Sequence, residues 1–241
     1  MSYHLTMKNI KKYLFECIMI VGSVLLSFYI DSIIDSKNKL ELKNSILFEL
    51  KTAIEEDLIQ LNNVIEIQKN ILSTNQILID DFLAENKIKK KILAESFSKL
   101  KQFGPLSFFI QRGPYSQLIE TGSFELIKDR DLKKNLLFAY DNYNKRKEFG
   151  DVLLDTFSLN FGRDLSPYIV ISESIKNEES IFYSSRTVDK YQISSDYYDS
   201  PIVLYYYSEY KFWIEGFIEI HEVYLRKLYE LEDQINKEID S

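Results

Sequence analysis

The sequence predicts an all-α protein in which an N-terminal transmembrane helix continues into a long-helix antiparallel bundle. Three observations predict this fold: an apolar segment near the N-terminus, apolar side chains at helical spacing along most of the remaining chain, and only 7 Gly and 4 Pro among 241 residues. We expect a basic tail (1–12), a transmembrane helix (13–34) and a helical soluble domain (35–241). A small irregular or β-hairpin excursion is expected near residues 166–200.

The apolar segment, from Tyr13 to Ile34, contains two acidic residues, Glu16 and Asp31. A helix of this length rises ~33 Å, which matches a hydrocarbon core of about 30 Å. No small-residue cleavage site follows the segment, which disfavours a cleaved signal peptide. Residues 17–30 carry too few polar side chains for an interfacial amphipathic helix. A buried helix of a soluble core is the remaining alternative, and the transmembrane helix is favoured over it.

The charges that flank the apolar segment predict its orientation in a membrane. Asp31 and Asp35 follow the uncharged centre of the segment. The lysines that precede it are Lys8, Lys11 and Lys12. The positive-inside rule therefore places the N-terminus in the cytoplasm and the main domain on the other side of the membrane.

Glu16 is the carboxylate nearest the start of the apolar segment. One hypothesis is an intramembrane polar contact between subunits or with a partner, since ionisable groups in a membrane are costly and often functional. The other is that Glu16 lies one turn from the lysine-rich boundary and its carboxylate reaches the headgroups. The second hypothesis is favoured.

Apolar residues recur at seven-residue spacing after the apolar segment, which is typical of a long amphipathic helix. The predicted seam is a possible self-association surface and consists of Leu40, Leu47, Leu50, Ile54, Leu61, Val64 and Ile71. Asp57 breaks the pattern. No glycine or proline lies between residues 40 and 72, so the transmembrane helix is expected to continue directly into this one.

Local signals then predict the remaining elements. The turn ENKIKKK (85–91) has lysines that suit a solvated loop better than a phosphate patch, and FGP (103–105) ends the next helix. Extended pieces are expected at YIVIS (168–172) and SIFYSS (180–185). The other expected elements are a short helix from Pro114 to a left-handed cap at Gly122, a helix from near Asp129 or Asp131 to about Leu165, and a final helix from Pro201 to about Ile239.

Two blocks of sequence resemble an uncharacterised bacterial family of small single-pass membrane proteins, a domain of unknown function. The first block begins at Tyr13 and joins Glu16 to IMIVGSVLLSFYI. The second is PYSQLIETGSFELIKDRDLKKNLL, with spaced positions Tyr115, Leu118, Gly122, Leu126 and Ile127. The resemblance implies a bacterial inner-membrane protein with one membrane helix, and it implies no activity. The polar run that follows the membrane helix in this family is replaced here by Asp31-Ser32-Ile33.

The residues that carry most chemistry are scarce. His4 and His221 are the only histidines, and Cys17 lies inside the apolar segment. Two histidines and one cysteine are too few for zinc sites of three or four Cys/His ligands in the soluble domain and for a di-iron centre with Glu-x-x-His on two helices. His221 is expected to be exposed or at the core edge. No P-loop or G-x-G-x-x-G pattern occurs, so we predict no metal, cofactor or catalytic residue.

These observations favour a membrane-anchored helical interaction or sensor-like protein without catalytic activity. The expected partners are the lipid bilayer and either another protein or further copies of the chain. The net charge of −7 disfavours nucleic acid. Two alternatives stay open: a carboxylate-dependent hydrolase with an active-site loop in 166–200, and an accessory subunit of a transporter or envelope complex.

Overall fold

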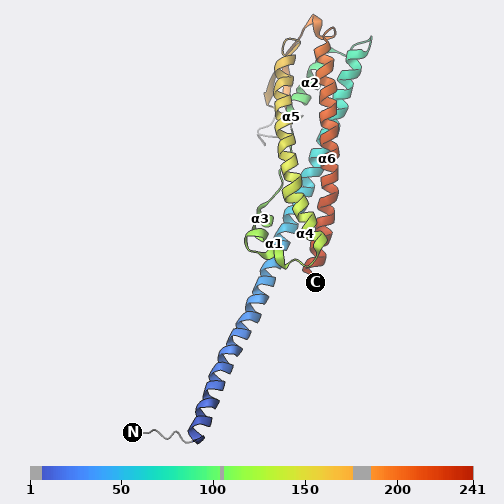
Figure 1. The fold of residues 1–241 in the computed structure, drawn as a ribbon. Coiled ribbons are helices and arrows are strands. Elements are labelled where there is room, and N and C mark those ends of the chain that lie inside the picture. The colour runs from blue at the N-terminus through green and yellow to red at the C-terminus, as the bar shows by residue number, and fades with distance from the viewer. Residues whose placement is uncertain (1–6, 104–105, 176–185, 241) are drawn as a thin grey trace.

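The protein is mostly helical with one small two-stranded antiparallel sheet (Figure 1). The structure, a computed structural model, describes residues 7–103, 106–175 and 186–240. The α-helices are α1 (Met7–Leu83), α2 (Lys90–Phe103), α3 (Gly113–Glu120), α4 (Arg130–Leu137), α5 (Asn144–Leu165) and α6 (Pro201–Ile239). The other elements are the strands β1 (Ile169–Ile175) and β2 (Arg186–Ile193), the 3-10 turns η1 (Ser123–Leu126) and η3 (Ser195–Tyr197), and the π-helical turn η2 (Phe138–Tyr143).

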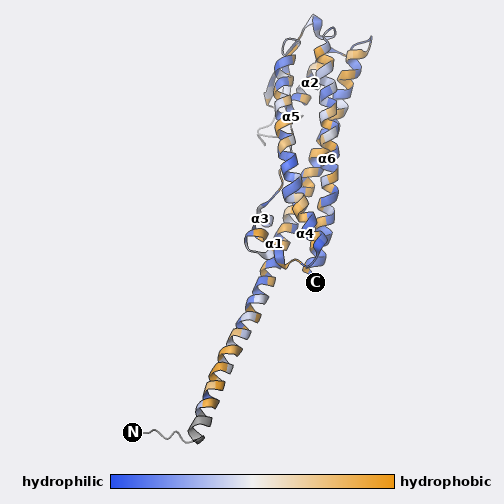
Figure 2. Cartoon of the chain, viewed as in Figure 1, coloured by the Kyte–Doolittle hydropathy of each residue, from blue (hydrophilic) through white to orange (hydrophobic). Residues whose placement is uncertain are grey.

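Helix α1 is continuous over 77 residues, which confirms the predicted direct passage from the apolar segment into the seven-spaced helix. Residues 13–42 are all exposed, and this part of α1 projects away from the rest of the chain (Figure 1). The far part of this projection consists mostly of hydrophobic residues, whereas hydrophobic and hydrophilic residues alternate along the other helices (Figure 2). From Lys43 onward α1 is packed against other elements, and we call that packed part of the protein the helical body.

The helical body contains two hydrophobic cores along the length of α1 and α6, which lie side by side (Figure 1). The first core lies at the base of the body, the end where α1 enters it, and joins α1 to α3, α4, η2 and the C-terminal half of α6. The second core lies farther along and joins α1 to α2, α5, β1 and the first half of α6. Aromatic side chains of α6 contribute to both cores: Tyr206, Tyr207 and Tyr210 lie in the second, and Tyr224 lies in the first. Trp213 of the same helix is partly buried.

The helix that was predicted from Asp129 to Leu165 is present, with a π turn in its middle. The Asp129 side chain caps α4, because its Oδ1 accepts the N–H groups of Asp131 at 2.8 Å and Leu132 at 3.3 Å. The π turn inserts an extra residue per turn and faces Tyr140 and Tyr143 into the core, where each stacks on another tyrosine ring. Side-chain periodicity gave no signal for this insertion.

The excursion between α5 and α6 contains the expected hairpin. Strand β1 pairs with β2 in antiparallel register from Ile169 opposite Ile193, with an irregularity between Ser172 and Glu173. The first extended piece therefore matches the prediction. The second predicted piece, SIFYSS (180–185), lies outside the described residues, and the observed partner strand, β2, follows it in the sequence.

The turn after α1 is organised by one of its lysines. Lys87 Nζ donates to the backbone oxygens of Phe82 at 2.9 Å and Ala84 at 2.5 Å, and it lies over the Tyr198 ring. These bonds satisfy carbonyls at the C-terminal end of α1, so the charge of Lys87 stabilises a helix end.

Gly122 ends the α3 turn with a φ of 70°, the left-handed conformation that the sequence predicts. We expect Gly122→Ala to lower the free energy of unfolding by about 1 kcal/mol, because a Cβ is disfavoured in this conformation. Urea denaturation in detergent would measure it. The control is Gly216→Ala within α6, where an added Cβ meets nothing within 4 Å and helix propensity favours alanine. An equal loss in both variants would contradict the prediction.

Candidate functional site

The projecting half of α1 is the first candidate site. Its most apolar stretch of 18 residues has a mean hydropathy of 2.1, and none of it is buried. By length and composition it is the helix of the described chain that could cross a membrane. Glu16 and Cys17 are exposed on its first turns.

An ion pair lies at the base of the body, at the point where α1 enters it. Lys43 Nζ lies 2.6 Å from Glu238 Oε1, and both side chains are almost completely buried. The Glu238 carboxylate also accepts the backbone N–H groups of Lys128 at 3.0 Å and Asp129 at 3.1 Å. Burial raises the pKa of Glu238, but the bonds from Lys43 and the two N–H groups outweigh it and lower this pKa below its ordinary value. One carboxylate thus connects α1, the start of α4 and the end of α6.

The predicted self-association seam lies mostly inside the body. Leu40 is exposed on the projecting part of α1. The six buried members are Leu47, Leu50, Ile54, Leu61, Val64 and Ile71, whose contacts are with the chain's own helices. In this fold those six side chains are not available to a second copy, because α6 and the shorter helices already cover them.

Three polar residues share this buried face of α1 at the same spacing. They are Asp57, Gln68 and Asn75, and each hydrogen-bonds to backbone of another segment. Asp57 accepts the N–H of Gln111 at 3.2 Å, and Gln68 donates to the oxygen of Leu106 at 3.3 Å. In the sequence, Asp57 was noticed only as an interruption of the seven-residue apolar pattern. A polar residue at such a core position is the signal that could have indicated a buried hydrogen bond to another segment.

The segment from Leu106 to Arg112, which we call the strap, lies extended along α1 without a strand partner. Asp57 and Gln68 of α1 bind two of its backbone groups, and Gln60 Oε1 accepts the N–H of Phe109 at 3.3 Å. On the other side, Ser107 donates to Asp151 at 2.8 Å and accepts from Lys147 at 2.9 Å. Side chains therefore replace the ladder of hydrogen bonds that an isolated extended segment lacks.

The ionisation of Asp57 is opposed by its surroundings. Burial raises the pKa of its carboxyl from 3.8 to about 7, and the negative charge of Glu56 adds to the rise, against the N–H of Gln111. The nearby hydroxyls of Tyr140 and Tyr224 are also buried, and burial raises the pKa of both. A carboxyl that titrates near neutral pH therefore lies in the lower core.

His221 is fully buried, which corrects the expectation of an exposed or core-edge side chain. Its Nδ1 lies 3.0 Å from Gln68 Oε1, and because that oxygen can only accept, Nδ1 carries the proton. Burial and the positive charge of Lys147 lower the pKa of His221 to about 4, against the opposing charge of Asp151. Among the described residues no group of three or more His, Cys, Asp or Glu side chains is arranged to hold a metal ion.

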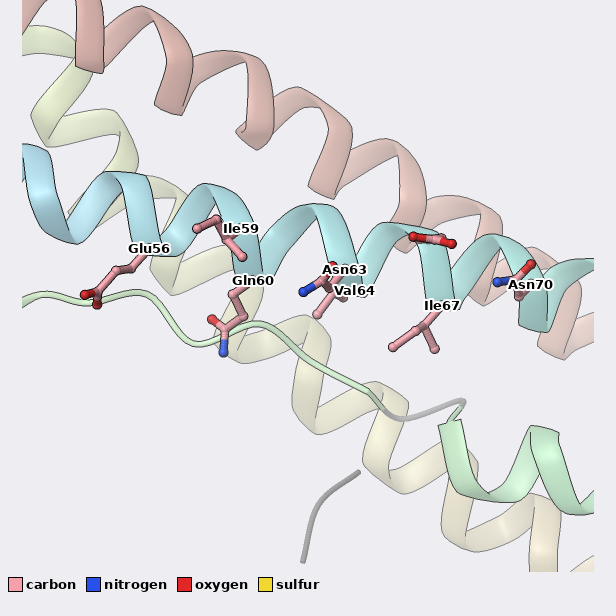
Figure 3. A pocket seen from close by; sticks show the side chains of 8 residues that line it. Glu56, Ile59, Gln60, Asn63, Val64, Ile67 and Asn70 are labelled. Atoms are coloured by element: carbon pink, nitrogen blue, oxygen red, sulfur yellow. The ribbon is translucent and has the colours of Figure 1, made fainter. Parts of the chain in front are cut away.

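A groove runs along the outward face of α1, next to the strap (Figure 3). Its lower part has a volume of about 600 Å³, and its lining continues through Ile67 and Asn70 into an upper part near Lys99 of α2. Isoleucine side chains alternate there with amides and two carboxylates, and Glu56, Ile59, Gln60, Asn63, Ile67 and Asn70 point from α1 toward the same side (Figure 3). Such a surface suits a helix or peptide better than a small polar substrate.

Residues 16–161 match the Family of unknown function (DUF6090), which is more than half of the chain. The chain belongs to this family. No curated protein and no solved structure matches the sequence. The resemblance to a family of unknown function that the two sequence blocks predicted is confirmed.

The part of the chain matched by DUF6090 begins at Glu16 and ends at Phe161. It therefore includes the projecting apolar helix, the groove, the strap and most of α5. The hairpin and α6 follow the matched part, although α6 supplies much of both cores. The description of this family names no activity.

Proposed function

We propose that this DUF6090 member is a single-pass protein of a bacterial inner membrane whose helical body binds another protein or further copies of the chain and has no catalytic activity. The observation that carries the proposal is the complete exposure of an apolar helix that is continuous with the core helix of the body. Water would solvate this contiguous apolar surface at a cost of ~25 cal/mol per Å², whereas a hydrocarbon environment removes that cost.

The geometry of α1 supports a body held close to the membrane surface. If the membrane ends near Ile34, residues 35–42 form an exposed helical stalk of ~12 Å before Lys43 enters the body. Stalk charges are paired along the helix, as in the 2.7 Å contact of Lys39 with Asp35. Three lysines and no acidic residue lie in residues 1–12, whereas the three lysines that follow the apolar segment, Lys37, Lys39 and Lys43, are interspersed with Asp35 and Glu41. This modest asymmetry favours a cytoplasmic N-terminus and a body on the other side. A body so placed meets proteins of the envelope, in an interaction or sensing role.

Membrane fractionation tests the anchor. We expect the intact wild-type chain to remain in the membrane pellet after alkaline carbonate washing. Val21→Arg combined with Leu25→Arg should remove it from the integral fraction, because each central arginine costs ~3 kcal/mol on insertion. The matched control is Phe48→Arg, a 63% exposed site on the body, which should stay in the pellet. Wild-type chain in the supernatant without detergent would contradict the proposal.

Reporter fusions at the two ends of the chain test its orientation in the membrane. A reporter enzyme that is active only in the cytoplasm, fused after Ser241, should be inactive, while the same reporter before Met1 should be active. The reverse pattern would place the body in the cytoplasm and contradict that part of the proposal.

A further inference from the structure

Two exposed stripes on different helices carry apolar side chains at the same spacing and opposite charges, Glu56 and Lys145, at their lower ends. The α1 stripe follows seven-residue spacing along the groove and consists of Glu56, Ile59, Asn63, Glu66, Asn70, Ser73 and Ile77, all exposed. The α5 stripe follows the same spacing and consists of Lys145, Phe149, Val152, Thr156, Leu159 and Arg163, also all exposed. The first stripe has acidic residues among its isoleucines, and the second has a basic residue at each end.

The α5 stripe is the more apolar of the two. Phe149, Val152 and Leu159 are 68%, 61% and 76% exposed, although Leu154 and Phe161 on the opposite side of α5 are buried and Phe161 packs on Tyr210 of α6. Large apolar side chains at 3–4-residue spacing on the outer side of a packed helix are the pattern of a helix–helix seam. Within one copy the side chains of both stripes are exposed, so neither stripe covers the other in this structure.

The stripes lie at matching levels along the body. Glu238 bonds both Lys43 and the backbone of Asp129, so α1 and the α4–α5 helix leave the base from the same level, and both run along the body (Figure 1). At 1.5 Å per residue, Ile59 and Ile77 lie ~24 and ~51 Å above the base. Phe149 and Leu159 lie ~30 and ~45 Å above it. The apolar part of one stripe thus falls within the span of the other.

We propose that the α5 stripe of one copy docks into the α1 groove of a second copy standing beside it in the same membrane. This inference rests on the proposed membrane anchoring, which gives all copies one orientation and brings the two stripes to the same height. In the parallel arrangement Lys145 lies within one turn of Glu56, and Phe149 lies beside Ile59 and Asn63. A groove of ~32 Å from Glu56 to Ile77 accommodates the ~27 Å from Lys145 to Arg163.

The contact is heterologous, because each copy offers a different surface to each neighbour. Repetition of a heterologous contact produces a ring when the rotation closes and an open row when it does not. The buried seam of α1 takes no part in it, since those side chains are in the chain's own cores. Self-association of this protein therefore uses the outward side of α1.

Cysteine cross-linking in native membranes tests the pairing. In a Cys17→Ser background, one tagged copy carries Ile59→Cys and a second, differently tagged copy carries Phe149→Cys. A short bismaleimide should link the two tags efficiently. The matched control replaces Phe149→Cys with Phe212→Cys, an equally exposed aromatic on α6 at 67%, and should give little product.

The outcomes separate this inference from the anchoring on which it rests. A predominant product between two Ile59→Cys copies would show a symmetric α1–α1 contact and overturn the docking. The docking would also be overturned if chain recovered in the membrane pellet gave no cross-linked product. Recovery of the chain in the supernatant overturns the anchoring itself, whatever the cross-links. As a second measurement, Val152→Glu with Leu159→Glu should weaken association about tenfold or more, while Phe212→Glu leaves it unchanged and all variants keep the wild-type circular dichroism.

Discussion

Glu238→Gln is expected to lower the free energy of unfolding of the helical body by about 3–5 kcal/mol, because it leaves the Lys43 ammonium buried without its counter-charge. The amide can still accept one N–H from the start of α4, so the loss reports mainly on the ion pair. The pair is 2.6 Å long and both side chains are 1–2% exposed, which is why its two charges depend on each other.

Urea denaturation of the full chain in detergent, followed by circular dichroism, would measure the loss. Glu41→Gln is the control, since the Lys37–Glu41 pair on the stalk is 3.7 Å long and well exposed. Exposed pairs of this type contribute less than about 1 kcal/mol. Equal stability of the Glu238→Gln variant and the wild type would show that water reaches Lys43, and would contradict the burial of this ion pair at the base of the body.

Asp57→Asn is expected to raise the free energy of unfolding at pH 8 by about 2 kcal/mol. Ionised Asp57 is destabilising in the folded state, because burial raises its pKa to about 7 from an unfolded value of 3.8. Each unit of such a rise corresponds to about 1.4 kcal/mol, and the cost of burying the new Nδ2 donor of asparagine offsets part of the gain. An asparagine can still accept the N–H of Gln111, so the strap keeps its contact.

The pH dependence of stability gives the sharper test. With a raised folded pKa, the contribution of Asp57 is fully present below pH 3.8 and is lost as the pH rises toward 7. His221 acts in the opposite direction: its folded pKa is about 4, so its contribution is present above pH 6.5 and is lost as the pH falls toward 4. Between about pH 4 and 6.5 the two contributions to the free energy of unfolding change in opposite directions with pH, so they offset each other in the wild type.

Substitution of either residue should therefore reveal the pH dependence of stability that the other residue contributes. Asp57→Asn should become less stable as the pH falls from 6.5 to 4, whereas His221→Gln should become less stable as the pH rises from 4 to 7. Urea midpoints at four pH values would show both trends. Parallel pH profiles for the wild type and both variants would mean that neither group is as buried as the structure places it.

Much of the helical architecture could be read from local signals. Asp129 before α4, Pro201 at the first position of α6 and the left-handed Gly122 act through the backbone within a few residues, so their effects do not depend on distant contacts. The strap, the π turn and the burial of His221 gave no comparable signal. Each depends on a partner that is far away in the chain, as Gln68 is from His221.

The sequence by itself determined the continuous α1, its exposed apolar half and the existence of a buried face at seven-residue spacing, because hydrophobic periodicity and the absence of breakers act within one helix. Only the tertiary structure decided what covers that face. A periodic apolar pattern specifies that a surface is buried, but the same pattern suits a second copy and the chain's own α6 equally well. In this fold the side chains of α6, the short helices and the strap cover the apolar face of α1. The candidate contact between copies therefore lies on the outward side of α1.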